Sequence, residues 1–222
     1  MNDNSSIVEL VDVSLANPGG REIFSEMNFT LTAGETAVIV GQTGSGKTSL
    51  VEMLIGYKRP DSGIVRVFGR NINLSSEGQI GLIRKKIGGV GGIFRTVDHL
   101  SVYENCLLPL LLNGEKTSVS RPKVMQILTQ FNLLNKKGEN AGNLSRGERV
   151  LLMLGRALAA NQPLLLIDEP LAGLVESTSS MVLKRIQRLA VSGHSLIILT
   201  TGQTGLAISG SREYHISDGK LK

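Results

Sequence analysis

Residues 36–48 read Thr-Ala-Val-Ile-Val-Gly-Gln-Thr-Gly-Ser-Gly-Lys-Thr, and this stretch decides the fold. Its second part, Gly41 to Thr48, matches the pattern G-x-x-x-x-G-K-[ST] of a phosphate-binding loop. The run 36–40 is short, apolar and β-branched, which predicts a buried strand, and the run 49–55 has apolar residues at helical spacing. A strand, a glycine loop and a helix in this order separate a true phosphate-binding loop from a chance match.

The residue types of this loop suit the binding of a nucleoside triphosphate. Glycines let backbone N–H groups turn inward around phosphate oxygens, and the helix N-terminus adds partial positive charge. Lys47 is placed to reach the β- and γ-phosphates, and the Thr48 hydroxyl is placed to bind Mg²⁺. The alternative is a glycine turn that only joins a strand to a helix. The candidate binding residues are Gly41, Gln42, Thr43, Gly44, Ser45, Gly46, Lys47, Thr48 and Ser49.

Length and composition favour a single α/β domain inside the cell. The chain has 222 residues, of which 41% are hydrophobic, and this is ample for one core. Residues 1–6 are polar, so no signal peptide is expected, and apolar runs such as 106–112 are too short to span a bilayer. The single cysteine, Cys106, excludes an internal disulfide and fits a reducing cytoplasm.

The net charge of +5 and the pI near 9.5 leave two interpretations open. A basic protein can bind nucleic acid or an anionic membrane surface. The lysines and arginines are dispersed and aromatic residues make up only 4% of the chain, so no stacking platform or basic stripe is visible. We therefore expect no nucleic-acid partner, and a positive surface near anionic lipid accounts for the charge equally well.

The rest of the chain alternates between predicted strands and helices, which indicates a largely parallel sheet. The run 87–94 reads as a short, glycine-rich strand. From 101 to 143 the character changes. Ser101 and Glu104 form a predicted capping box before a leucine-rich helix, and a second helix is expected over about 122–133. This segment is predicted to be a helical insertion.

Two carboxylates follow an apolar run at 164–167. Asp168 at such a strand end is suited to bind the waters of Mg²⁺, and Glu169 is suited to orient and deprotonate an attacking water. Alone, Asp-Glu-Pro is a common loop start. A phosphate-binding loop upstream reverses the balance in favour of function.

A third motif reads Leu-Ser-Arg-Gly-Glu at 144–148. One interpretation is a capping box, in which Ser145 caps an amphipathic helix and Glu148 lies three residues further on. The other is a phosphate sensor, because a capped helix N-terminus beside Gly147 can bind an anion. Both interpretations can hold together.

Along the chain, the phosphate-binding loop comes first, Leu-Ser-Arg-Gly-Glu second, and the apolar run with Asp168 and Glu169 last, about 20 residues after the second motif. Together, the three motifs resemble the ATP-binding-cassette (ABC) ATPases, the nucleotide-binding subunits of ABC transporters. The resemblance covers essentially the whole chain. Tyr-Glu-Asn at 103–105 and Leu-Pro-Leu at 108–110 look closest to the bacterial cell-division and lipoprotein-release ATPases. The resemblance implies an α/β fold: a P-loop NTPase core with a mostly parallel sheet, an antiparallel β subdomain and a helical insertion. It implies one domain over 1–222, with the core in 1–100 and 144–222 and the helical subdomain at about 101–143.

The resemblance also implies the roles of the site residues. Gly41 to Thr48 would bind ATP and Mg²⁺, Asp168 would hold Mg²⁺ through water, and Glu169 would be the general base. Ser145 and Gly147 would contact the γ-phosphate held by a second ABC subunit, either a copy of this chain or a paralogue. The helical insertion would dock a separate transmembrane permease, which places the chain in the cytoplasm at the inner face of the membrane.

The chain departs from the family pattern at five positions. These are Asn17 in place of an aromatic residue, Gly92 in place of a Gln, Arg146 in place of the first signature glycine, Val175 in place of an Asp, and Thr201 in place of a His. Losing one preorganised polar group typically costs about 10²–10³ in rate. The sequence therefore predicts an ABC ATPase that hydrolyses ATP slowly to drive or gate its membrane partner. The alternative is an ATP-gated interaction or regulatory module with little or no hydrolysis.

Overall fold

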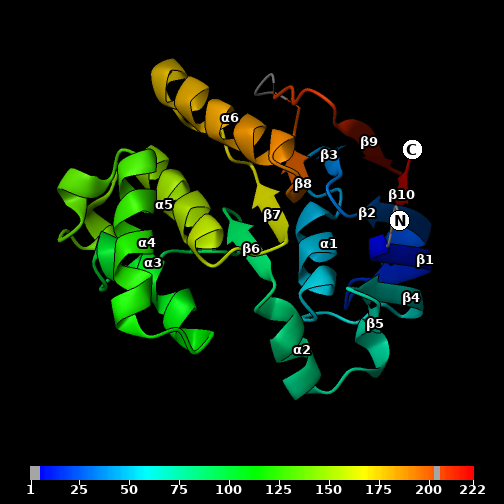
Figure 1. Ribbon diagram of the computed structural model, residues 1–222. Coiled ribbons are helices and arrows are strands. Elements are labelled where there is room, and N and C mark those ends of the chain that lie inside the picture. The colour runs from blue at the N-terminus through cyan, green and yellow to red at the C-terminus, as the bar shows by residue number, and fades with distance from the viewer. Residues whose placement is uncertain (1–5, 203–205) are drawn as a thin grey trace. The chain divides into compact units, whose positions relative to one another are not determined.

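The computed structural model describes residues 6–202 and 206–222. The chain forms two compact units. One consists of the chain up to Arg84 together with Ile186–Lys222, and the other consists of Lys85–Arg185. Figure 1 shows the elements of both in chain order.

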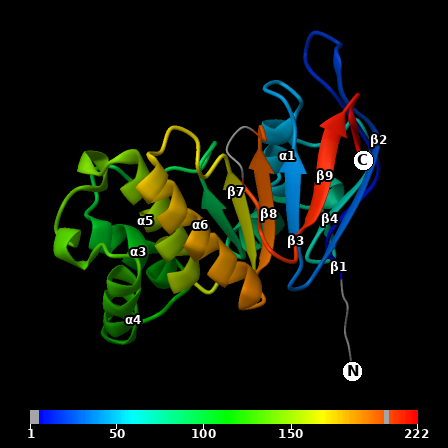
Figure 2. The same cartoon turned by 90° about the horizontal axis from the view of Figure 1, so that it is seen from above.

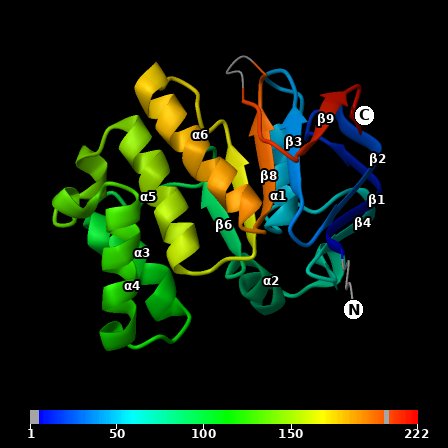
Figure 3. The ribbon, with the colours of Figure 1, turned by 45° about the horizontal axis from the view of Figure 1, so that its top comes forward.

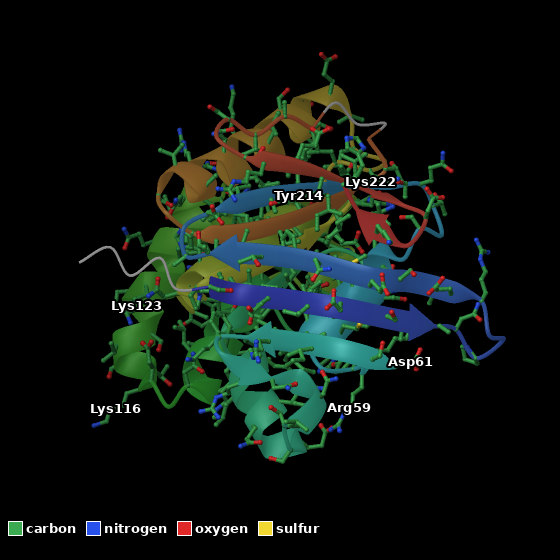
Figure 4. The ribbon with its side chains drawn as sticks, turned by 90° about the vertical axis from the view of Figure 1, so that its right-hand side faces the viewer. Arg59, Asp61, Lys116, Lys123, Tyr214 and Lys222 are labelled. Atoms are coloured by element: carbon green, nitrogen blue, oxygen red, sulfur yellow. The ribbon has the colours of Figure 1, made fainter. Side chains whose placement is uncertain are left out.

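An antiparallel sheet forms one part of the first unit. Its strands are β1 (Ser6–Ala16), β2 (Glu22–Thr32), β4 (Ser62–Val67) and β5 (Arg70–Asn71), in the order β2-β1-β4-β5. Alternate side chains of β1 are buried, as in a sheet with one solvated face. Figure 4 looks onto this sheet, with Asp61 just before the start of β4. The Asp61 carboxylate accepts a hydrogen bond of 2.7 Å from the Ala16 amide and so fixes the end of β1.

Parallel strands form the other part of the first unit. Strand β3 (Thr36–Val40) pairs in parallel with β8 (Ser195–Thr200) on one side and with β9 (Arg212–Ser217) on the other, as Figure 2 shows. Every residue of β8 is buried, which is typical of a parallel strand covered on both faces. Strand β10 (Lys220–Leu221) returns antiparallel to β9. The helices of this part are α1 (Lys47–Leu54), η1 (Ile72–Leu74) and α2 (Glu77–Arg84).

The second unit combines a parallel strand pair with helices. Strands β6 (Ile87–Val90) and β7 (Leu164–Asp168) pair in parallel. Helices α3 (Val102–Leu112), α4 (Thr117–Gln130) and α5 (Arg146–Ala159) pack against one another, as Figure 3 shows. Short 3₁₀ turns, η2 (Leu134–Lys136) and η3 (Ala141–Asn143), lie between α4 and α5. Helix α6 (Glu176–Val191) begins in this unit and leads the chain back to the first.

The predicted fold class is confirmed: parallel core strands, a separate antiparallel sheet and helices are all present. The expected capping box before α3 is also present, because the Ser101 hydroxyl accepts from the Glu104 amide and the Glu104 carboxylate accepts from the Ser101 amide. The predicted extent of the helical insertion, about 101–143, remains a prediction. Helices α3 and α4 lie within it.

Two predicted elements have different bounds in the structure. The strand expected over 87–94 ends at Val90, because Gly91 and Gly92 both adopt left-handed backbone angles that no strand contains. The helix expected to begin near Pro122 begins at Thr117, so that Pro122 lies inside it. The amides of Val119 and Ser120 both donate to the Lys116 carbonyl and form the first turn before the proline is reached.

None of the helices in the described parts of the chain has both the length and the apolar character needed to cross a membrane.

Candidate functional site

The glycine loop between β3 and α1 has the backbone geometry of an anion cradle. Gly44 and Gly46 have φ values of 82° and 103°, in the left-handed region that side chains disfavour. A Cβ on Gly46 would lie 2.7 Å from Ile23 Cγ2 and 2.7 Å from Phe24 Cε1, so the loop is closely packed beneath as well. Only glycine fits position 46.

Lys47, the first residue of α1, lies within this loop. Its side chain is buried, and its Nζ donates to the carbonyl oxygens of Gly41 at 2.5 Å and Gln42 at 3.1 Å. Burial of an ammonium group requires such acceptors. The lysine is therefore held inside the cradle by the loop's own main chain.

A cavity of about 490 Å³ opens beside the loop, and its lining comes from separate elements of the first unit. It is lined by Arg21, Val40, Gly41, Gln42, Thr43, Gly44, Ser45, Thr201, His215, Ile216, Ser217 and Asp218. Thr201, expected from the resemblance in place of a γ-phosphate-contacting His, thus lies in the same cavity as the loop. Within the described chain, the buried Ser45 hydroxyl has no hydrogen-bond partner. This hydroxyl lies against Gly41, because a Cβ on Gly41 would overlap it.

The remaining predicted binding residues follow on α1. Thr48 is exposed on the first turn of the helix, where its hydroxyl is open to a ligand. Ser49 is buried, and its hydroxyl accepts a hydrogen bond of 3.3 Å from Lys58. The structure therefore places the whole predicted set, 41–49, in one continuous loop and helix start.

The two predicted carboxylates lie at the end of β7 in the second unit. Asp168 is the buried last residue of the strand, and Glu169 follows with a φ of 48°. A left-handed backbone is unusual for a glutamate, and such strain gathers at functional sites. Among the described residues, no group of three or more His, Cys, Asp and Glu side chains is arranged to hold a metal ion. The role of Asp168 in holding Mg²⁺ stays a prediction.

A cavity of about 640 Å³ within the second unit brings these carboxylates together with two of the departures from the family pattern. Gly92, Arg146, Asp168 and Glu169 all line it. The Nη1 atom of Arg146 lies 3.5 Å from the position that a Cβ on Gly173 would take, so the guanidinium covers the loop that follows Glu169.

Ser145 and Gly147 lie at the N-terminus of α5 and are not among the residues that line this cavity. Ser145 forms the predicted capping box with Glu148. The Glu148 Oε1 atom also forms an ion pair with Lys136 Nζ, at 2.8 Å. Partial burial alone would raise the pKa of the Glu148 carboxyl, but hydrogen bonds from Lys136 and Ser145 lower this pKa below its ordinary value. Gly147 is buried, and a Cβ there would overlap the side chain of Thr178 on α6. Both residues therefore have a structural role, and the phosphate contact stays a prediction.

The other departures are placed as follows. The Asn17 side chain closes its own turn, because its Oδ1 accepts from the amides of Gly19 and Arg21, each at 3.0 Å. Val175 is exposed just before α6. Neither presents an aromatic ring or a carboxylate.

Sequence reasoning missed Asn105, which is fully buried in α3. Its Oδ1 accepts from the Val97 amide at 2.8 Å, and its Nδ2 donates to the carbonyl oxygens of Val97, Leu100 and Ser101. Asn105 thereby anchors the segment that leads from the 640 Å³ cavity into α3. The sequence does hold one sign of this role, an asparagine on a leucine-rich helix, because a polar side chain buried on such a helix needs hydrogen-bond partners.

The fold and the loop define a nucleotide-binding α/β protein of the P-loop class. The profile of a family described as "ABC transporter" matches residues 24–172. The chain belongs to the ABC transporter family and has the fold of its ATP-binding cassettes.

Individual relatives agree with this assignment. The lipoprotein-releasing system ATP-binding protein LolD of Chromohalobacter salexigens is 30% identical over 200 residues, which cover 90% of this chain and 84% of LolD. The cell division ATP-binding protein FtsE of Bacillus subtilis is 27% identical, covering 96% of this chain and 93% of FtsE. An ATP-binding cassette solved as a dimer with ADP and Pi superposes with a TM-score of 0.86 at 24% identity, covering 97% of this chain and 96% of the other.

Proposed function

We propose that the chain is the ATP-binding subunit of a membrane transport complex, that it binds Mg-ATP at Gly41–Ser49, and that it hydrolyses ATP slowly to drive or gate a separate membrane partner. The observation that carries the proposal is the loop itself. Lys47 is held by main-chain carbonyls within a left-handed glycine cradle, and the buried Ser45 hydroxyl of the same loop has no hydrogen-bond partner among the described residues. These features suit the binding of a triphosphate.

The chemistry assigned to each residue follows from its place. Mg²⁺, when bound, supplies the positive charge that offsets the charge of the β- and γ-phosphates. Thr48 would hold the metal through its exposed hydroxyl, and Asp168 through water. Glu169 would accept a proton from the attacking water. Its left-handed backbone, with a φ of 48°, is consistent with a side chain that is held in one position. Lys47 would bind the β- and γ-phosphate oxygens.

Slow turnover is proposed because groups that assist hydrolysis in the family pattern are changed. Gly92 has no side chain to orient a water, Val175 has no carboxylate, and Thr201 offers a hydroxyl in place of an imidazole. Each such loss typically costs about 10²–10³ in rate, although losses within one site do not add simply. We expect a kcat well below about 10 s⁻¹.

Two partners belong to the proposal. A second cassette, either a copy of this chain or a paralogue, would receive Ser145 and Gly147 against its γ-phosphate. A membrane permease would dock on the helical region at about 101–143, which would hold the chain at the cytoplasmic face of the membrane. The relatives named as lipoprotein-releasing and cell-division proteins support partners of this kind.

The Mg²⁺-dependent release of phosphate from ATP tests the turnover part of the proposal. Wild type should show a slow rate that Glu169→Gln abolishes, while the exposed Glu176→Gln on α6 serves as a matched control and keeps the rate. Thr201→His should raise the rate, since Thr201 lines the cavity of the loop. A rate unaffected by Glu169→Gln would refute the assigned base.

A second candidate is an ATP-gated interaction module in which nucleotide binding, and not turnover, changes the partner. The changes at Gly92 and Val175 favour it, whereas family membership and the retained Glu169 favour turnover. The same assay, run beside a calorimetric titration with Mg-ATP, separates the two. Nucleotide binding without any Glu169-dependent phosphate release would select the interaction module.

A further inference from the structure

The glycine pair at 91–92 forms a tight turn after β6. Strand β6 ends at Val90, and Gly91 and Gly92 follow with φ values of 73° and 56°. Two consecutive left-handed residues cost little only when both are glycine. This pair therefore reverses the chain in a way that other residues at 91 and 92 would resist.

The turn lies directly against Asp168. A Cβ on Gly91 would overlap the Asp168 carbonyl oxygen, and a Cβ on Gly92 would overlap its carboxylate. At position 92 the added atom would come within 2.9 Å of Asp168 Cγ, a distance that real Cβ contacts essentially never show, and within 3.0 Å of Asp168 Cβ, which is tighter than most real contacts. The main chain of the turn therefore packs on the carboxylate with no space between them.

Neighbouring contacts hold the turn in this place. The Phe94 amide donates to the Gly91 carbonyl at 2.9 Å and closes the turn, while the Phe94 ring occupies the position where Gly89 would carry a side chain. Further along, the buried Asn105 binds both the amide and the carbonyl of Val97. The segment that contains the turn is therefore held by β6 on one side and by the Asn105 hydrogen bonds on the other.

We propose that the Gly91–Gly92 turn is a positioning element for Asp168, which fixes the orientation of the carboxylate by main-chain contact. The inference rests on the proposed role of Asp168 in holding Mg²⁺. Groups that orient a metal ligand typically contribute 10–100-fold to metal affinity. In the ABC pattern position 92 is a Gln, and the change to glycine does more than remove that side chain. The glycine backbone takes space that any side chain at 92 would need.

This proposal reverses the expectation from sequence alone. If Gly92 were only a missing side chain, Gly92→Gln would restore a family-like site. If the turn positions Asp168, Gly92→Gln and even Gly92→Ala must displace the carboxylate or the turn. Magnesium should then contribute less to nucleotide binding.

The test is the ratio of ATP dissociation constants measured in EDTA and in Mg²⁺, by calorimetry on the full chain. We expect Gly92→Ala and Gly92→Gln to lower this ratio about tenfold relative to wild type, with the constant in EDTA unchanged. Gly114→Ala is the matched control, because Gly114 also has a left-handed φ of 84° but its Cβ would meet no atom within 4 Å. It should keep the wild-type ratio.

Asp168→Asn separates the failure of this inference from the failure of the proposed function. If Asp168→Asn lowers the ratio but Gly92→Gln keeps or raises it, the positioning role is wrong while the metal role stands. If wild type and Asp168→Asn have the same ratio, the metal role fails and the inference falls with it.

Unfolding temperatures give an independent reading that needs no ligand. Gly92→Ala should lower the unfolding temperature more in wild type than in an Asp168→Ala background, because that background removes the carboxylate with which the new methyl group overlaps. An equal decrease in both backgrounds would show that no contact with Asp168 is involved and would overturn the inference.

Discussion

The Lys47 ammonium group donates a 2.5 Å hydrogen bond to the carbonyl oxygen of Gly41, the residue that opens its own loop. A second hydrogen bond, of 3.1 Å, goes to the Gln42 carbonyl. Both acceptors are neutral, and a charged phosphate oxygen is a stronger partner for an ammonium group. The side chain is thus held near its proposed ligand by bonds that a phosphate can replace.

Gly46 should be the most sensitive glycine of the loop. Gly46→Ala would place a methyl group 2.7 Å from both Ile23 and Phe24 at a φ of 103°, and we expect a loss of about 3 kcal/mol in the free energy of unfolding. Gly44→Ala is the control: its φ is 82° but its Cβ would meet nothing within 4 Å, so only about 1 kcal/mol should be lost. Urea denaturation followed by circular dichroism measures both. Equal losses would contradict the packing argument.

Adenine and guanine should be poorly discriminated, because Asn17 supplies no aromatic face and its side chain is committed to the turn at 17–21. We expect dissociation constants for Mg-ATP and Mg-GTP within about tenfold of each other. Asn17→Tyr should tighten the binding of both nucleotides if stacking worth about 1 kcal/mol is restored. Asn17→Ala loses the same turn bonds without adding a ring and serves as the control. A strong preference of wild type for Mg-ATP would show that another residue reads the base.

ATP should drive the pairing of two cassettes if Ser145 and Gly147 act on the nucleotide of a second subunit. Light scattering of Glu169→Gln with excess Mg-ATP should then show a dimer, because hydrolysis cannot reset the complex. Arg146 lies between Ser145 and Gly147 in this motif, and its guanidinium group packs over Gly173. Its position can therefore affect how the motif meets a second subunit. Should Glu169→Gln stay a monomer with and without Mg-ATP, self-pairing would be excluded and a paralogue or the membrane partner would be required.

Acid should weaken the start of α5 through Glu148. Hydrogen bonds from Lys136 and Ser145 hold the pKa of Glu148 below its ordinary 4.5, against the opposing effect of burial. A carboxyl group whose pKa is lower in the folded state stabilises that state at pH values above its pKa in the unfolded chain. This contribution is lost as the pH falls through the pKa of the folded state. Between neutral pH and pH values below 4.5, the unfolding temperature of wild type should therefore fall further than that of Glu148→Gln. Parallel curves for the two proteins would count against this role.

Local patterns predicted the elements that depend on neighbouring residues. The capping boxes at Ser101 and Ser145 are both present, because each requires only a hydroxyl and a carboxylate three residues apart. The loop at 41–48 likewise follows from its glycines and its flanking apolar runs.

Contacts between distant segments were beyond the reach of these patterns. The sequence pattern predicts a phosphate sensor at Gly147, but the burial of Gly147 against Thr178 depends on how α6 packs on α5. The position of Gly92 against Asp168 has the same origin, since β6 and β7 meet only in the folded sheet. A sequence shows that glycines are present at 91 and 92, but not which group they make room for.

Calorimetric titration of the full chain with Mg-ATP tests the central claim most directly. We predict binding in the micromolar-to-millimolar range, which Lys47→Ala weakens sharply because the ammonium group that meets the β- and γ-phosphates is gone. Lys220→Ala, which removes an exposed lysine from the same unit, should bind as wild type does. No binding of Mg-ATP to wild type, or equal binding by wild type and Lys47→Ala, would contradict the account.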